Sequence, residues 1–372
     1  MTVPALFSPL ALGPISLPNR IVVAPMCQYT ADDGSATDWH LQHWMTLAMS
    51  GAALVVVEAT GVERRGRITH GCLGLYSDAN ERAMARGLAA ARAVALPGTR
   101  FGIELAHAGR KASVQRPWEG GRALGPTEDP WPTIGPSAVP FDDGWHTPEA
   151  LDDAGLERVT AAFVAAARRA VRLGFDAIEL HMAHGYLFHS FLSPLSNRRG
   201  DRWGGDAARR RAFPLAAARA VRDAVPAGIA LGVRVSATEW VEGGFGVEDA
   251  AVLATELKAI GYDFVCASSG GNAARARVPT AASYQVPLAR EIRQKSGLLT
   301  RAVGLIVDPH QADAILTRGD ADQVALGRTI LDDPRWGWHA ADALGVDLAL
   351  PPQYARAGAR TWPGRTLLAA AE

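Results

Sequence analysis

A histidine pair followed by a tyrosine is the group of side chains in this sequence best suited to chemistry. His181 and His184 stand three residues apart, and Tyr186 follows, in the run HMAHGY. A lone histidine usually belongs to the core, but two beside a tyrosine favour a functional role. One interpretation is a metal site, which needs further ligands nearby. The other is a pair of neutral donors that polarise a carbonyl oxygen while Tyr186 delivers a proton.

A second group of residues, nearer the C-terminus, is typical of a phosphate site. Gly304 and the pair Gly327-Arg328 each follow a short apolar run. Glycine lets backbone N–H groups approach a phosphate, and an arginine can bind it with two parallel hydrogen bonds. The alternative is two turn glycines and a surface arginine.

The chain contains three cysteines, at positions 27, 72 and 266, and none forms a CxxC pair. This spacing encodes neither an iron–sulfur cluster nor a thiolate zinc site. Cys27 stands directly after an apolar run, so it is either a small buried hydrophobe or a soft side chain that tunes a redox cofactor.

The apolar runs would bring these residues together if they were the strands of a barrel. Eight nearly continuous apolar runs alternate with amphipathic, alanine-rich stretches, which is typical of strands buried on both faces. The runs cover residues 20–26, 53–59, 100–106, 175–181, 229–236, 262–268, 299–305 and 322–327. The helical stretches cover 38–50, 79–95, 152–173, 206–225, 247–260, 286–296, 309–317 and 333–344. This alternation predicts a (β/α)8 TIM barrel with its active site at the C-terminal strand ends.

The alternative fold is a doubly wound sheet, but no G-x-G-x-x-G follows an early strand. We expect a single domain over residues 1–372, with a C-terminal tail over about 345–372. A long excursion over 112–148, rich in proline, glycine and tryptophan, follows the third strand. Loops of this length in compact domains are usually functional or disordered, and the tryptophans favour an ordered lid.

Charge and hydropathy restrict the partners. Lys+Arg and Asp+Glu both number 38, so the chain has no net field to attract nucleic acid or an acidic membrane. No apolar run approaches the roughly 20 residues of a membrane helix, and the N-terminus lacks the pattern of a signal peptide. We therefore expect no nucleic-acid or membrane partner and a cytoplasmic location.

Several long motifs, in order along the chain, resemble the Old Yellow Enzyme family. They are NRIVVAPMCQY (19–29), GRIT (66–69), ELAHAGRKAS (104–113), HMAHGYLFHSFLSPLSN (181–197), RVSATEW (234–240), YQVP (284–287), AVGLI (302–306) and ALGR (325–328). The resemblance extends from about residue 6 to about residue 354. Cys27 is similar to the cysteine that stands beside the flavin in a bacterial class of this family.

The resemblance implies an FMN-dependent NAD(P)H oxidoreductase, an ene-reductase of the NADPH dehydrogenase type. NADPH, or less often NADH, would reduce the FMN, which would then pass hydride to an activated alkene in a ping-pong cycle. The substrates would be small α,β-unsaturated carbonyl or nitro compounds. The resemblance further implies a homodimer or homotetramer in which Arg356 reaches a neighbouring active site.

The resemblance also implies a role for each site residue. His181 and His184 would hold the substrate oxygen, Tyr186 would donate the proton, and Cys27 would tune the flavin. The residues implied to bind the cofactor are Ala24, Pro25, Met26, Cys27, Ala59, Glu104, His181, Arg234, Gly304, Gly327 and Arg328. The residues implied to contact the substrate are Tyr29, His181, His184, Tyr186 and Arg356. No metal is implied.

Glu104 departs from the family pattern, which has a glutamine at this position. A glutamine can donate a hydrogen bond to the flavin edge, whereas an ionised glutamate can only accept one. Two hypotheses follow. Either Glu104 is protonated in its site, with its pKa raised by burial and by the flavin, or it is ionised and makes the flavin harder to reduce.

Three other functions are compatible with parts of the sequence. One is another flavin barrel, related to dienoyl-CoA reductases or amine dehydrogenases, which the absence of a cysteine cluster disfavours. A second is a metal-dependent hydrolase that uses His181 and His184. The third is a flavin-binding barrel with slow or different redox chemistry, or none, because of Glu104.

Overall fold

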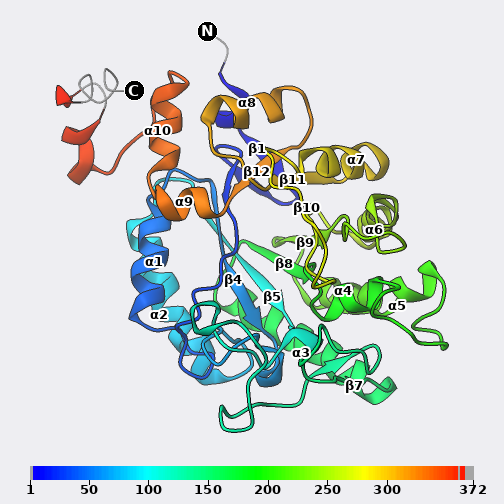
Figure 1. The fold of residues 1–372 in the computed structure, drawn as a ribbon. Coiled ribbons are helices and arrows are strands. Elements are labelled where there is room, and N and C mark those ends of the chain that lie inside the picture. Colours follow the sequence, from blue (N-terminus) through cyan, green and yellow to red (C-terminus); the bar gives the residue numbers. More distant parts are fainter. Residues whose placement is uncertain (1–2, 359–360, 365–372) are drawn as a thin grey trace.

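The computed structural model describes residues 3–358 and 361–364, and its central feature is a closed barrel of eight parallel strands (Figure 1). Around the barrel the strand order is β10-β11-β12-β3-β4-β5-β8-β9. The strands are β3 (Ile21–Val23), β4 (Leu54–Gly61), β5 (Arg100–Ala106), β8 (Ala177–Met182), β9 (Ala230–Ser236), β10 (Phe264–Ser268), β11 (Leu299–Val303) and β12 (Gln323–Leu326). Each overlaps a predicted run, so the (β/α)8 barrel is confirmed and the doubly wound alternative is wrong.

Helices surround the barrel, as Figure 1 shows. They are α1 (Asp38–Ala48), α2 (Asp78–Val94), α3 (Asp153–Arg172), α4 (Leu187–Leu192), α5 (Ala207–Ala224), α6 (Val247–Ile260), α7 (Val286–Ser296), α8 (Pro309–Thr317), α9 (Arg328–Asp332) and α10 (Trp336–Ala343). Aspartates at positions 152, 206 and 308 each accept a hydrogen bond from a first-turn N–H and so fix where α3, α5 and α8 begin. The sequence pattern missed α4 and α9. All six residues of α4 are buried, so it shows no amphipathic period.

The side chains of the strands alternate between two apolar cores. One set points outward and packs against the helices, as Val55, Ile103 and Leu180 do. The other set points into the barrel, as Val22, Leu54 and Phe264 do. This alternation follows from the two-residue period of a strand, and it decides which residues can reach the barrel interior.

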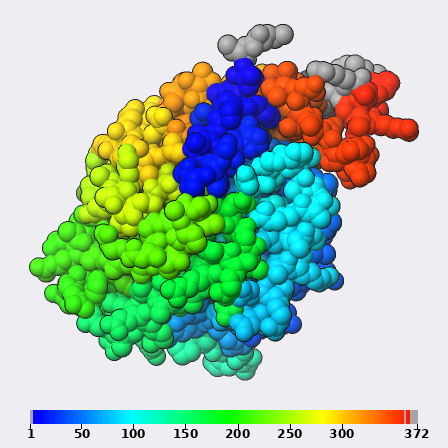
Figure 2. All heavy atoms as spheres, turned by 180° about the vertical axis from the view of Figure 1, so that it is seen from behind, coloured from blue at the N-terminus to red at the C-terminus, as the bar shows by residue number. Residues whose placement is uncertain are grey.

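A short hairpin fills the N-terminal end of the barrel. It consists of β1 (Leu10–Leu12) and β2 (Ile15–Leu17), which pair antiparallel. Its apolar residues belong to the same buried cluster as the inward-facing residues of the strands. Figure 2 shows this N-terminal segment, in blue, on the rear face between the cyan and the yellow-to-orange parts of the chain. The hairpin therefore closes one end of the barrel and leaves the other end for a site.

The excursion over 112–148 folds back onto the strand ends. It contains a 3-10 turn, η4 (Pro117–Glu119), and a short strand, β6 (Ile134–Gly135), which pairs in parallel with β7 (Glu149–Ala150). The indole N–H of Trp131 donates to the Arg65 carbonyl at 3.0 Å, and the Trp118 ring meets the Tyr29 ring edge-to-face at 5.9 Å. These contacts hold the excursion against the loops at the C-terminal end of the barrel.

The described part of the tail forms a 3-10 segment, η5 (Pro352–Ala357), beside α10. Residues 359–360 and 365–372 of the predicted tail lie outside the described residues.

Across the portion that the structure does describe, none of the helices is both long enough and apolar enough to span a bilayer.

Packing inside the barrel yields a stability prediction. A Cβ atom on Gly232 would lie 2.3 Å from the ring of Phe264, its register partner on β10. We expect Gly232→Ala to lower the free energy of unfolding by about 1–3 kcal/mol, because the ring cannot shift freely in a packed interior. The measurement is the urea midpoint followed by circular dichroism.

Gly228→Ala is the matched control, because a Cβ there would meet nothing within 4 Å. Its midpoint should stay close to that of the wild type. Equal midpoints for the two variants would contradict the packing argument.

Candidate active site

A cavity of about 700 Å³ opens at the C-terminal ends of the barrel strands. Its lining comes from the segment after β3, from β9, β10, β11 and β12 and the loops that follow, and from the excursion. The lining includes Ala24, Pro25, Met26, Cys27, Tyr29, Trp118, Arg234, Ser268, Gln285, Gly304, Gly327 and Arg328. The structure thus brings together, at one end of the barrel, residues that are up to about 300 positions apart in the sequence.

The predicted site residues fall into three groups. Most of the predicted cofactor-binding residues line the large cavity, together with Tyr29. Glu104, His181, His184, Tyr186 and Ala59 are not part of this lining, and Ala59 and Tyr186 border a separate small void of about 10 Å³. Arg356 is exposed on η5, outside this cavity. Its predicted contact with a second subunit stays a prediction.

The two histidines form a directed hydrogen-bond chain that ends at the cavity. The N–H of Ala183 donates to His181 Nδ1 at 3.2 Å, so the ring proton of neutral His181 lies on Nε2. This Nε2 is 3.2 Å from His184 Nδ1, and His184 Nε2 is 2.7 Å from Ser268 Oγ. These hydrogen bonds assign the ring protons: His181 donates to His184 Nδ1, and His184 donates through Nε2 to Ser268, which lines the cavity.

Burial decides the protonation of these groups. Burial, reinforced by the charge of Arg234, holds the pKa of His181 and of His184 well below its usual range, so both imidazoles are neutral. Burial likewise raises the pKa of the Tyr186 phenol, whose ring meets His181 edge-to-face at 4.8 Å. The histidine chain therefore ends in one neutral imidazole donor, His184 Nε2, and the phenol beside His181 keeps its proton.

A strained turn holds His184 in place. Its φ of 59° lies in the left-handed region that non-glycine residues rarely adopt, and Gly185 follows at 77°. The N–H of His184 donates to Ser236 Oγ at 2.9 Å. The Lys111 side chain donates through Nζ to the carbonyls of His184 and Gly271, at 2.8 and 2.7 Å. These bonds satisfy the backbone of the turn and compensate for its strain.

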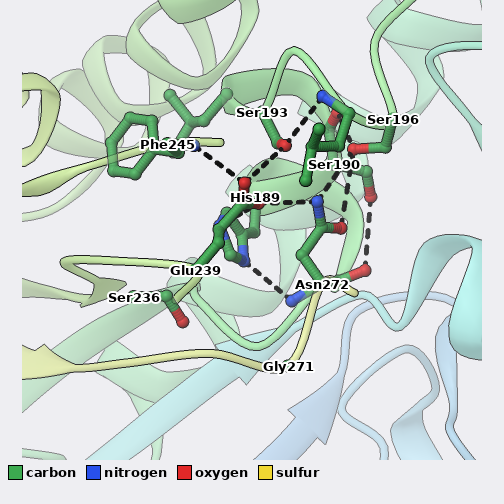
Figure 3. A network of polar contacts seen from close by, with 12 residues as sticks. His189, Ser190, Ser193, Ser196, Ser236, Glu239, Phe245, Gly271 and Asn272 are labelled. Atoms are coloured by element: carbon green, nitrogen blue, oxygen red, sulfur yellow. Dashed lines mark hydrogen bonds and ion pairs between the residues drawn. The ribbon is translucent and has the colours of Figure 1, made fainter. Parts of the chain in front are cut away.

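Beneath this turn lies a buried polar network (Figure 3). The Glu239 carboxylate accepts hydrogen bonds from the Asn272 amide at 2.6 Å, from Ser193 Oγ at 3.0 Å and from the Phe245 N–H at 2.8 Å. It also lies 3.1 Å from His189, whose Nδ1 accepts from the Gly185 N–H at 2.8 Å. The network therefore connects the histidine turn after β8 to the loop after β10.

Cys27 is a thiol, not a thiolate. Burial is the largest cause that raises its pKa, and the nearby Cys72 and Glu58 add to the effect. A reactive cysteine needs positive surroundings that lower its pKa, so this environment disfavours a nucleophilic role. The sulfur lies in the cavity wall with Met26, where a soft side chain can contact a flat aromatic ligand.

The cavity has features that fit FMN. Gly327 leaves open space, since a Cβ there would meet only Met26 Sδ, at 3.8 Å. The neighbouring Arg328 supplies a positive charge on the same loop. Within residues 3–358 and 361–364, Arg234 Nε is a buried donor without a hydrogen-bond partner. An anionic, polar ligand would satisfy these groups.

A metal site finds no support around the histidines. In the part of the chain that the structure describes, no group of three or more His, Cys, Asp or Glu side chains is arranged to hold a metal ion. His181 and His184 instead bond to each other and to Ser268.

Sequence reasoning missed two residues of this site. Ser268 is the last residue of the sixth predicted strand, and its position at a strand end was the available signal. Lys111 follows β5 in a motif that the resemblance included, but a charged side chain gave no sign that it would be buried against the turn of His184.

The chain matches the sequence model of the NADH:flavin oxidoreductase / NADH oxidase family over residues 5–345. It is 40% identical over 354 residues to an NADPH dehydrogenase of Listeria innocua, covering 95% of this chain and 98% of that protein. It is 41% identical over 355 residues to an NADPH dehydrogenase of Geobacillus thermodenitrificans, covering 94% of this chain and 98% of that protein.

Solved structures show the same architecture. Morphinone reductase superposes with a TM-score of 0.74 at 28% identity, covering 94% of this chain and 92% of that one. A 2-naphthoyl-CoA reductase superposes with a TM-score of 0.81 at 21% identity, which shows the fold alone. The match covers 91% of this chain but only 52% of the reductase.

Lys111 gives a pH-dependent prediction. Burial, followed by the neighbouring charge of Arg110, lowers the pKa of Lys111 to about 7. Between this value and the unfolded pKa of about 10.4 the unfolded chain binds the extra proton, so stability increases with pH. We expect the unfolding free energy of wild type minus that of Lys111→Met to increase between pH 7 and 9. The slope should approach about 1.4 kcal/mol per pH unit.

The measurement is urea unfolding at several pH values. Lys258→Met is the control, because Lys258 also donates to two carbonyls, those of Ser296 and Gly297, but at the protein surface. A constant difference between wild type and Lys111→Met over this range would contradict the prediction.

Proposed function

The chain belongs to the NADH:flavin oxidoreductase / NADH oxidase family and is an NAD(P)H-dependent flavin oxidoreductase, and we propose that it reduces activated C=C bonds. The resemblance to the Old Yellow Enzyme family is confirmed, and the cofactors are FMN and a nicotinamide donor. The proposed substrates are small α,β-unsaturated carbonyl or nitro compounds.

The position of the His184 donor supports the proposed substrate class. The neutral histidine chain places the Nε2 donor of His184 against Ser268 at the cavity wall, next to the protonated Tyr186. Neutral N–H donors draw electron density from a C=C bond when they bind a conjugated carbonyl or nitro oxygen.

The residues that would hold FMN lie along the cavity wall. They are Ala24, Pro25, Met26, Cys27, Arg234, Gly304, Gly327 and Arg328, with Gly327 and Arg328 suited to the phosphate. When bound, FMN would supply the hydride-transfer chemistry that links oxidation of the nicotinamide donor to reduction of the alkene. The protein contributes binding, orientation and polarisation.

Each remaining residue has a proposed role in the alkene half-reaction. A substrate oxygen that takes the place of Ser268 Oγ would accept the hydrogen bond of His184 Nε2, while His181 Nε2–H, which donates to His184 Nδ1, would hold the His184 ring in this orientation. Tyr186 would give its phenolic proton to the α-carbon. Tyr29 and Trp118, in edge-to-face contact at 5.9 Å, would form the outer wall and exclude water. The proposed homodimer or homotetramer would add Arg356 from a neighbouring chain.

A direct test uses the purified protein. It should be yellow, release FMN on denaturation, and oxidise NADPH faster when 2-cyclohexenone or N-ethylmaleimide is added. Mass spectrometry should find the saturated product, two hydrogens heavier than the alkene. If the protein binds FMN but neither alkene increases the rate of NADPH oxidation, the proposed substrate class is overturned. A flavin barrel with different redox chemistry would then be favoured.

Tyr186→Phe separates the two half-reactions. We expect flavin reduction by NADPH to keep its rate, while reoxidation by 2-cyclohexenone slows by about 10²–10⁴-fold because the proton donor is lost. Stopped-flow absorbance measures each half-reaction by itself.

Tyr76→Phe removes a hydroxyl that bonds the Asp33 carbonyl, and should alter neither rate. An unchanged reoxidation rate in Tyr186→Phe would assign the proton transfer to another group.

A further inference from the structure

The interior of the barrel contains two carboxyl groups side by side below the cavity. Glu104 on β5 and Glu179 on β8 are register partners on adjacent parallel strands, and both point into the barrel. Adjacent strands lie about 4.8 Å apart, so the two side chains must meet. Their side chains are 2% and 1% exposed, so the two carboxyl groups lie beside each other away from solvent. Two ionised carboxylates cannot hydrogen-bond, since neither has a proton to donate.

Only one of these two carboxyl groups is in direct contact with a guanidinium group. Arg301, fully buried on β11, lies 2.8 Å from Glu179 Oε2 and stacks over the Phe264 ring at 4.4 Å. Arg234 on β9 lies 4.0 Å from Glu104 Oε1, too far for a hydrogen bond. An ionised glutamate buried beside a guanidinium would be expected to close that gap, because the charged pair gains most from direct contact.

Other groups that face Glu104 do not supply the missing charge. His181 on β8 lies 3.9 Å away and is neutral. The remaining titratable groups that influence the pair electrostatically are thiols and a phenol, and these are also uncharged: Cys27, Cys266 and Tyr186. Among the described buried atoms, Glu104 Oε1 and Glu179 Oε1 have no hydrogen-bond partner. The surroundings therefore compensate one negative charge on the two carboxyl groups closely, and the second carboxyl group keeps its proton.

We propose that Glu104 and Glu179 share a single proton, with Glu104 as the neutral member that donates to the Glu179 carboxylate paired with Arg301. The charge of Arg234 is then left uncompensated at the wall of the cavity. On the proposed function, this charge is available to the electron-rich edge of FMN. The pair is a positioning device for charge and takes no part in bond making.

Burial agrees with this assignment. Desolvation is the largest cause that raises the pKa of Glu104, and Glu179 raises it further, while Arg234 and Arg301 oppose both effects. A carboxyl pair that shares one proton is a stable arrangement where like charges stand too close for both to ionise.

Infrared spectroscopy of the purified flavoprotein at neutral pH tests the proposal. The difference spectrum of wild type minus Glu104→Gln should contain the carbonyl stretch of a protonated carboxylic acid, shifted in D₂O. Glu179→Gln should also lose this band, because Glu104 would then ionise and pair with the free arginines. Absence of the band from the first spectrum, or its persistence in Glu179→Gln, would overturn the shared proton.

Glu256→Gln is the matched control for the infrared test, and the Kd of FMN is a second measurement. Glu256→Gln removes a carboxylate that pairs with Arg211 at the surface, and its difference spectrum should show only ionised carboxylate. Glu104→Gln replaces one neutral group by another, so the Kd of FMN should change by less than about threefold. A change of more than about tenfold would indicate that wild-type Glu104 is charged. If no FMN binds, the proposed function fails, while the infrared band still decides the shared proton.

Discussion

Closure of the eight parallel strands is the constraint on which the rest of this structure depends. Once the barrel is closed, every second side chain of every strand points into one narrow interior. The N-terminal hairpin fills one end with leucine and isoleucine, so inward-facing polar side chains can reach solvent or a ligand only at the other end. A cavity at the C-terminal strand ends is therefore a consequence of the closure, and the chemistry of the site is decided by which residues the register places there.

The interior is arranged in levels along the barrel axis. Apolar residues such as Phe264 pack on the hairpin, Glu104, Glu179 and Arg301 come next, and Arg234 and His181 lie nearest the cavity. Burial of an ion pair is costly unless its hydrogen bonds are well made, so this level contributes little net stability. We infer that its value is electrostatic, because it sets the charge at the bottom of the cavity.

The histidine turn illustrates how the same closure supports a strained active-site residue. His184 adopts a left-handed backbone between β8 and α4, a conformation that an isolated chain would rarely hold. Lys111 from the β5 loop, Ser236 from β9 and the Glu239 network all bond to it or its neighbours. These groups are distant in the sequence and meet only because β5, β8, β9 and β10 are neighbours in the barrel.

The sequence by itself determined the barrel and the family, and most of the residues that it assigned to the cofactor do line the cavity. Nearly continuous apolar runs that alternate with amphipathic stretches are a clear signal, and long motifs keep their residues in order. It could not place Ser268 and Lys111, whose roles depend on contacts across the barrel, nor α4, whose complete burial removes the helical period. It left open whether Glu104 is ionised. Only the tertiary structure set Glu179 beside it and Arg301 beyond, because strand register, not sequence spacing, decides which buried charges meet.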